Sequence, residues 1–313
     1  MLSSNPSGRS CARRPALLAQ PIWGTVAPSW CLTSHRSSTN QQGCCMVEPT
    51  PMQAFHKAPD PDRILLLDQF DEALARLEYG VREKEITLLT GDIGTGKTTL
   101  TRALIDRLDD EVQFCWIINP RLSASQFLRQ IALQLDLEPA RGKVDLLDQL
   151  ANAFLDASSA GRPVSLLIDE AQMMPPDTLE ELRLLTNIQL DAENLISVTL
   201  VGQPELLRRL RQPRFLPLLQ RVGVRYHLSP LTEDETTAYI RTRLQNAGYP
   251  PEMFDEQARS AVYAYSHGLP RVINNLCGNA LLAAMLDGAD TVTSDLIDDV
   301  AADLGLVLAR GEG

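Results

Sequence analysis

The spacing of apolar residues predicts two kinds of element that alternate from residue 68 onward. Short apolar runs, typical of strands buried on both faces, occur at residues 86–89, 112–118, 164–168, 196–201 and 222–228. Between them the spacing is that of amphipathic helices, at residues 68–80, 123–135, 144–157 and 178–186, with another helix ending near Leu108. This alternation predicts an α/β fold in which a parallel five-stranded sheet has helices on both faces.

The pattern changes after Pro230, where strand-like runs stop. Helical patterns then occupy residues 232–247, 255–266, 270–286 and 294–304, separated by Gly, Pro and Asp. Thr232 and Glu235 have the spacing of a capping box, which marks a helix start. We therefore expect an α/β domain at residues 51–230 and a small α-helical lid domain at residues 231–313.

The first 50 residues are rich in Ser, Pro, Arg and Cys and have no sustained apolar period, so we expect a disordered tail. The tail has Arg but no acid before Glu48, a composition that resembles an organelle transit peptide. An extended gene start, with Met46 or Met52 as the true first residue, is the alternative that we favour.

The segment after the first predicted strand matches the phosphate-loop pattern G-x-x-x-x-G-K-S/T in full. Glycines allow backbone N–H groups to wrap a triphosphate, and the following helix directs its positive end at the anion. Lys97 is expected to reach the β- and γ-phosphates and Thr98 to ligate Mg²⁺. A chance Gly-rich turn is the alternative, which the flanking strand and helix disfavour. The residues predicted to bind ATP are Gly91, Asp92, Ile93, Gly94, Thr95, Gly96, Lys97, Thr98 and Thr99.

Two acids, Asp169 and Glu170, directly follow the apolar run at residues 164–168, which is the form of a Walker B element. Asp169 would hold Mg²⁺ through water, and Glu170 would polarise the water that attacks the γ-phosphate. Many strands end in solvated acids, but the full phosphate loop upstream favours the catalytic interpretation.

Three further polar residues are candidates for the reaction. Gln203 follows the fourth strand and is predicted to contact the γ-phosphate or its water, with an ordinary turn amide as the alternative. Arg221, just before the last strand, is predicted to act as an arginine finger on a neighbour's nucleotide, or else to be a surface Arg paired with an acid. Arg271 follows Pro270 in the first turn of a helix, where a γ-phosphate would compensate its charge.

Charge and composition limit the kinds of molecule that the protein is expected to bind. The formal net charge is −11, although residues 1–47 contain only basic charges, so the acidic body argues against broad nucleic-acid binding. Arg208, Arg209, Arg211 and Arg214 form the one dense basic cluster, for which a solvated helix face is the alternative. The cysteines show neither metal-ligand spacing nor a disulfide framework, and no apolar run is long enough to span a bilayer. We expect a protein of a reducing compartment that reaches a membrane only through a partner.

Several blocks together resemble the AAA+ ATPases of the ExeA/GspA type. They are Asn119-Pro120, Asp169-Glu170-Ala171-Gln172, Gly202-Gln203-Pro204-Glu205-Leu206, Leu219-Gln220-Arg221 and Gly268-Leu269-Pro270-Arg271 with Ile273-Asn274. The resemblance implies an AAA+ P-loop domain at residues 51–230, followed by the lid.

The same resemblance implies a homo-oligomer with shared ATP sites. It would couple Mg-ATP turnover to the assembly or energising of cell-envelope machinery, such as type II secretion, a pilus or exopolysaccharide export. The expected location is the bacterial cytoplasm, at the inner membrane through an envelope protein supplied in trans.

Longer members carry a transmembrane helix or a peptidoglycan-binding module, and this sequence reaches Gly313 without either, which leaves the envelope role open. A DNA-binding AAA+ ATPase for transposition target selection is the alternative, disfavoured by the acidic body. A scaffold that binds ATP without turnover is disfavoured by the presence of Glu170, Gln203 and Arg221.

Overall fold

The computed structural model describes residues 54–55, 68–190 and 193–307. All of them belong to one compact unit, residues 48–313. The tail predicted at residues 1–50 lies outside the described residues. Within the described ranges, no helix has both the length and the apolar character needed to cross a membrane.

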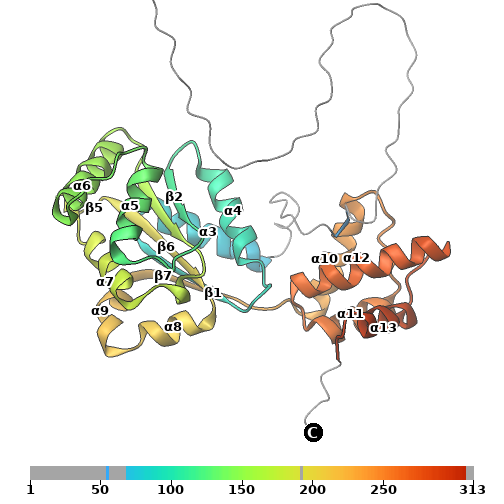
Figure 1. Ribbon diagram of the computed structural model, residues 1–313. Helices are drawn as coiled ribbons and strands as arrows, with labels where there is room; N and C mark the ends of the chain where they lie inside the picture. Colours follow the sequence, from blue (N-terminus) through green and yellow to red (C-terminus); the bar gives the residue numbers. More distant parts are fainter. Residues whose placement is uncertain (1–53, 56–67, 191–192, 308–313) are drawn as a thin grey trace, which may run out of the picture. The chain divides into compact units, whose positions relative to one another are not determined.

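A five-stranded sheet organises the α/β part, with strand order β2-β3-β6-β1-β7 and every pairing parallel (Figure 1). The strands are β1 (Ile86–Gly91), β2 (Gln113–Ile117), β3 (Val164–Ile168), β6 (Ile196–Gly202) and β7 (Val222–Leu228). This confirms the predicted parallel sheet. β1 lies between the middle strand β6 and the outermost strand β7, so the loop that follows β1 lies at the carboxyl edge of the sheet, beside the end of β6.

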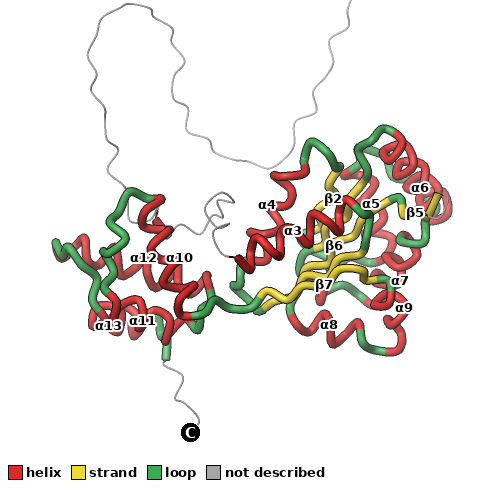
Figure 2. The backbone as a smooth tube through the Cα atoms, turned by 180° about the vertical axis from the view of Figure 1, so that it is seen from behind, coloured by secondary structure: helices red, strands yellow, loops and turns green. Residues whose placement is uncertain are grey.

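Helices cover both faces of the sheet because neighbouring strand residues point to opposite sides (Figure 2). Leu89 and Leu167 pack in the apolar cluster that includes α3 (Asp68–Arg82) and α4 (Lys97–Leu108). Leu88 and Leu166 face the opposite cluster. That second cluster includes α5 (Ala124–Gln134), α6 (Lys143–Ser159), α7 (Pro176–Leu185), α8 (Pro204–Leu210) and α9 (Leu216–Gln220).

Some short elements were not predicted from the apolar spacing. They are α8, α9, the 3₁₀ turns η1 (Ala171–Met173) and η2 (Pro213–Phe215), and a hairpin of β4 (Gln189–Leu190) and β5 (Glu193–Asn194). Elements this short have too few residues to repeat an apolar period.

The C-terminal region is helical, as predicted, with α10 (Glu233–Asn246), α11 (Glu256–Ser266), α12 (Pro270–Asp287) and α13 (Ser294–Asp303). The predicted capping box is present, since the Thr232 N–H donates to Glu235 Oε2 at 2.8 Å and the Glu235 N–H to Thr232 Oγ1 at 3.2 Å. Phe55 also packs here, with its ring edge-on to Phe254 at a centroid distance of 6.0 Å. The lid core therefore includes a residue that precedes the α/β part in sequence.

Candidate nucleotide-binding site

The loop between β1 and α4 has the shape that its glycines predict. Gly94 and Gly96 have φ angles of +89° and +102°, a region that residues with a side chain rarely adopt. A Cβ at Gly94 would lie 2.9 Å from Cβ of Arg271, so the loop is also closely packed. No side chain caps the N-terminus of α4, so the start of this helix can accept an anion, although the Thr99 N–H already donates to the Gly96 carbonyl oxygen at 3.0 Å.

The other loop residues either line the cleft or close the loop. Ile93 and Thr99 are cleft-lining residues, and Ile93 is 58% exposed. Thr95 is buried, and its hydroxyl donates to the Asp92 carbonyl oxygen at 2.9 Å.

The Lys97 ammonium is buried inside the loop. Its Nζ donates to the carbonyl oxygens of Gly91 and Asp92, each at 2.8 Å. Burial lowers the pKa of Lys97, and the nearby carboxylates of Glu170 and Asp169 act in the opposite direction. The lysine therefore lies between the loop and the strand-end acids.

Thr98 and Asp169 meet directly, since Thr98 Oγ1 donates to Asp169 Oδ2 at 3.1 Å. Asp169 is only 4% exposed, and burial raises its pKa, while hydrogen bonds from the Glu170 N–H and Thr98 act against that shift. A hydroxyl beside a buried carboxylate suits Mg²⁺, a cation that prefers oxygen ligands. One carboxylate and one hydroxyl would leave most coordination positions of Mg²⁺ to water and phosphate, the ligands that this cation usually keeps.

Glu170 has left-handed backbone angles, φ 50° and ψ 37°, which are uncommon for a residue with a side chain. Its carboxylate accepts hydrogen bonds at Oε2 from Gln172 Nε2 and, at 3.4 Å, from Gln203 Nε2. The two acids that follow β3 therefore have different partners, because Asp169 bonds to Thr98 at the start of α4 and Glu170 to Gln203 at the start of α8.

The first turn of α12 closes the site from the lid side. The Arg271 N–H donates to the Gly94 carbonyl oxygen at 3.2 Å. Loop and lid border a cleft of about 610 Å³, a volume typical of small-ligand sites. Glu170, Gln203 and Arg271 all line it. Its other lining residues include Phe70, Arg102, Tyr239, Asn274 and Asn275.

Phe70 of α3 also lines the cleft. The sequence patterns did not single out Tyr239 and Asn274 as site residues. The Tyr239 hydroxyl, whose pKa is raised by burial, donates to Asn274 Oδ1 at 3.0 Å. Asn274 belongs to the Ile273-Asn274 block noted above, which was the available signal.

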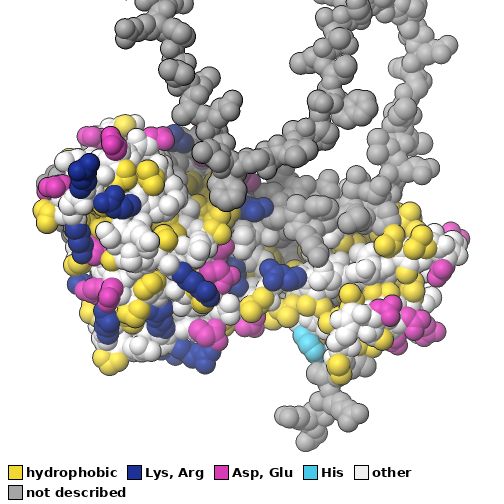
Figure 3. All heavy atoms as spheres, viewed as in Figure 1, with side chains coloured by type: hydrophobic (Ala, Val, Ile, Leu, Met, Phe, Trp, Pro, Cys, Tyr) yellow, Lys and Arg dark blue, Asp and Glu magenta, His cyan; other side chains and the backbone are white. Residues whose placement is uncertain are grey.

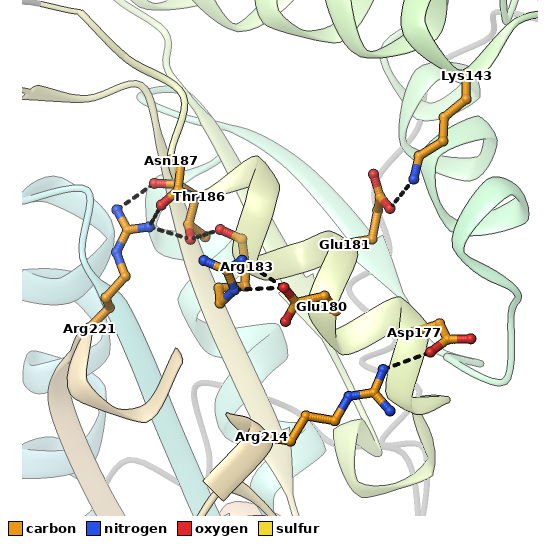
Figure 4. A network of polar contacts seen from close by, with 9 residues as sticks. All are labelled: Lys143, Asp177, Glu180, Glu181, Arg183, Thr186, Asn187, Arg214 and Arg221. Atoms are coloured by element: carbon orange, nitrogen blue, oxygen red, sulfur yellow. Dashed lines mark hydrogen bonds and ion pairs between the residues drawn. The ribbon is translucent and has the colours of Figure 1, made fainter. Parts of the chain in front are cut away.

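Arg221 is not among the residues that line this cleft. Figure 4 shows its side chain directed at Thr186 and Asn187, which follow α7. Its guanidinium donates to the carbonyl oxygen of Thr186 at 2.7 Å, to the Thr186 hydroxyl at 3.0 Å, and to the side chain of Asn187. The partners are neutral groups at the end of α7 and not an acid. A role on a neighbour's nucleotide stays a prediction.

Two of the four arginines in the basic cluster on and after α8 form ion pairs. Arg208 pairs with Glu205, and Arg214 pairs with Asp177 at 2.8 Å. In the view of Figure 3, basic and acidic side chains are interspersed over the α/β part. These pairs favour the solvated helix face over an anion-binding patch.

Comparisons with known proteins agree with this geometry. An AAA domain model matches residues 81–210, which include the phosphate loop, Glu170 and Gln203. General secretion pathway protein A of Aeromonas hydrophila is 40% identical over 241 residues, which cover 76% of this chain and 44% of that protein. The chain therefore spans less than half the length of this relative.

Solved structures share the fold at lower identity. The Aeropyrum pernix ORC2 protein in ADPNP-ADP complexes has a TM-score of 0.62 and 18% identity, covering 80% of this chain and 71% of that chain. Drosophila ORC bound to DNA has a TM-score of 0.62 and 18% identity, covering 89% of this chain and 70% of that chain. By its P-loop fold, its matched AAA domain and its identity to this relative, the chain is an AAA protein similar to General secretion pathway protein A, which confirms the resemblance to the ExeA/GspA type.

Proposed function

We propose that the protein binds Mg-ATP in the cleft between the phosphate loop and α12 and hydrolyses it. The observation that supports this most strongly is the convergence of four groups on one cleft. They are the glycine-rich loop with Lys97, the Thr98–Asp169 pair, Glu170, and Arg271 of the lid. ORC2, which shares the fold, is described with ADPNP and ADP.

Each group has a distinct role in the proposed reaction. Loop N–H groups and Lys97 would hold the phosphates, and Thr98 with Asp169 would hold Mg²⁺, which neutralises charge on the transferred phosphoryl group when bound. Glu170 would take the proton of the attacking water, with Gln203 beside it. Arg271 would contact the γ-phosphate from the lid, so that ATP binding draws α12 toward the loop.

Titration calorimetry with ATP and Mg²⁺, combined with steady-state hydrolysis, tests the proposal. Lys97→Ala should abolish measurable ATP uptake. Glu170→Gln should keep ATP affinity and lower kcat by about 10²–10⁴-fold, the usual contribution of a general base. If wild-type protein takes up no ATP, or if Lys97→Ala binds it equally well, the proposal is wrong.

The biological process that we propose is the assembly or energising of cell-envelope machinery by a homo-oligomer with shared ATP sites. The support is the identity to General secretion pathway protein A. An envelope protein supplied in trans would hold the ATPase at the cytoplasmic side of the inner membrane. Co-purification from envelope fractions that requires ATP and is lost in Lys97→Ala would test this partner.

DNA targeting is distinguished from envelope assembly by one measurement. Stimulation of hydrolysis by duplex DNA, together with salt-sensitive retention, would favour transposition target selection. The ion pairs of Arg208 and Arg214 lead us to expect neither effect.

A further inference from the structure

Gln172 of η1 has no role in the reaction proposed above, yet it contacts Glu170, Gln203 and Arg209. Its side-chain Nε2 donates to Glu170 Oε2, and its Oε1 accepts from the Gln203 N–H at 3.1 Å. Its own carbonyl oxygen accepts from Arg209 Nη1 at 2.9 Å. The side chain therefore joins the Walker B acid to the start of α8, while its backbone is held by the same helix.

The fit around Gln172 is close on the side of β6. A Cβ at Gly202 would lie 2.6 Å from Gln172 Oε1, so the amide occupies space that only a glycine leaves open. Arg209 is itself held, with its guanidinium 5.6 Å from the centroid of the Phe215 ring. Gln172 is therefore held on two sides, with its side-chain amide against Gly202 of β6 and its backbone carbonyl bonded to Arg209 of α8.

The two carboxylate oxygens of Glu170 differ in their hydrogen bonds. Oε2 accepts from the amides of both Gln172 and Gln203. Oε1 accepts no hydrogen bond from the residues that the structure describes at residues 68–190 and 193–307. One oxygen is thus anchored, and the other is free to accept a proton from water.

We infer that Gln172 is a positioning residue for hydrolysis, which holds the Glu170 carboxylate so that its free oxygen meets the attacking water, and that Arg209 braces Gln172 from α8. This inference rests on the proposed ATPase function. It requires a side chain that donates at one atom and accepts at the other, which a glutamine supplies and an isosteric glutamate or methionine does not.

Two substitutions at Gln172 separate positioning from folding. Gln172→Met keeps the length and loses both hydrogen bonds, so kcat should fall about tenfold to hundredfold with ATP affinity within about twofold. Gln172→Glu still accepts from the Gln203 N–H but brings a second carboxylate to Glu170. Its kcat should therefore fall at least as far as that of Gln172→Met while ATP affinity stays within about twofold, because the donor to Glu170 Oε2 is replaced by a repelling carboxylate.

Arg209 and Arg208 form a matched pair on one helix. Arg209→Ala should lower kcat several-fold without changing ATP affinity, whereas Arg208→Ala, which removes only an exposed pair with Glu205, should match wild type. Thermal unfolding verifies that each variant is folded, and the Arg209 result stands even if Gln172→Met does not fold.

The outcomes distinguish the two proposals. If wild-type protein does not hydrolyse ATP, the proposed function fails and this inference fails with it. If wild type hydrolyses ATP while Gln172→Glu and Arg209→Ala both keep wild-type kcat, only the positioning role of Gln172 is wrong.

Discussion

At the scale of single residues, Lys97 and Asp169 are ionisable side chains that are buried in the fold. Burial lowers the pKa of Lys97 and raises the pKa of Asp169, and in both cases the buried environment disfavours the charged form. Such groups cost folding free energy that a bound phosphate or cation would offset. The site should therefore be a source of instability in the protein without nucleotide.

Replacing Asp169 by Asn tests this cost. Without nucleotide at neutral pH, Asp169→Asn should raise the free energy of unfolding by about 1 kcal/mol, or roughly 2–4 °C in Tm. The folded-state pKa is raised, so the wild-type penalty is absent below the unfolded-state pKa and develops as pH rises through the folded-state pKa. Thermal unfolding over a pH series should show the advantage of Asn disappearing toward acid.

Asp92→Asn is the control, since Asp92 is an exposed acid of the same loop. It should change Tm little at any pH. A lower Tm for Asp169→Asn than for wild type at neutral pH would contradict the burial argument. Asp169→Asn should also bind ATP no more tightly with Mg²⁺ than without it.

Site residues could be predicted from sequence where their position depends on spacing along the chain, and not where it depends on contacts between distant segments. The phosphate loop and the two acids after β3 follow from sequence because their spacing along the chain is the determinant. The contacts of Gln172 and Arg221 could not be predicted, because they depend on where the ends of α7 and α8 lie in space.

At the scale of elements, the start of α12 is joined to the phosphate loop by the hydrogen bond from the Arg271 N–H to the Gly94 carbonyl. Gly94→Ala should disturb this junction, because its φ of +89° strains an alanine and its Cβ would lie 2.9 Å from that of Arg271. We expect ATP affinity to fall about tenfold, corresponding to ~1.4 kcal/mol. Titration calorimetry measures the change.

Gly161→Ala provides the matched control for Gly94→Ala. Gly161 also has a positive φ, +76°, but a Cβ there would meet nothing within 4 Å. This variant should lose stability through backbone strain alone and keep ATP affinity. Equal affinities in the two variants would show that the junction with α12 does not matter for binding.

The elements differ in how well their sequence predicts them. Buried strands and helices of ten or more residues were predicted to within a few residues, because each repeats its period several times. The bounds of β3 and β7 match the prediction at both ends. The seven-residue α8 and five-residue α9 were missed, since each begins near a proline and spans at most two turns.

At the scale of the whole molecule, Arg221 bears on whether one subunit holds a complete site. Its guanidinium lies at the end of α7, bonded to Thr186 and Asn187 (Figure 4), and it does not line the cleft of its own chain. The proposed shared site therefore predicts that turnover per subunit rises with protein concentration. It also predicts that Arg221→Ala loses turnover while keeping ATP affinity.

Mixing two inactive variants tests this sharing directly. Glu170→Gln lacks the base and Arg221→Ala lacks the finger, so an interface that pairs intact Glu170 with intact Arg221 exists only in the mixture. For random assembly of equal amounts, about a quarter of interfaces would be complete, so the mixture should recover about that fraction of wild-type turnover. The measurement is steady-state hydrolysis against mixing ratio.

Thr186→Val tests whether turnover depends on Arg221 itself or on the contacts that hold it at the end of α7. It removes one hydroxyl partner of Arg221 and leaves the guanidinium in place, so it should lower Tm and keep turnover.

Recovery in the mixture of Glu170→Gln and Arg221→Ala requires that ATP sites be shared, because neither variant can complete a site alone. Wild-type turnover by Arg221→Ala at saturating protein would instead mean that each subunit hydrolyses ATP without its neighbour, and Arg221 would then serve only to hold the end of α7.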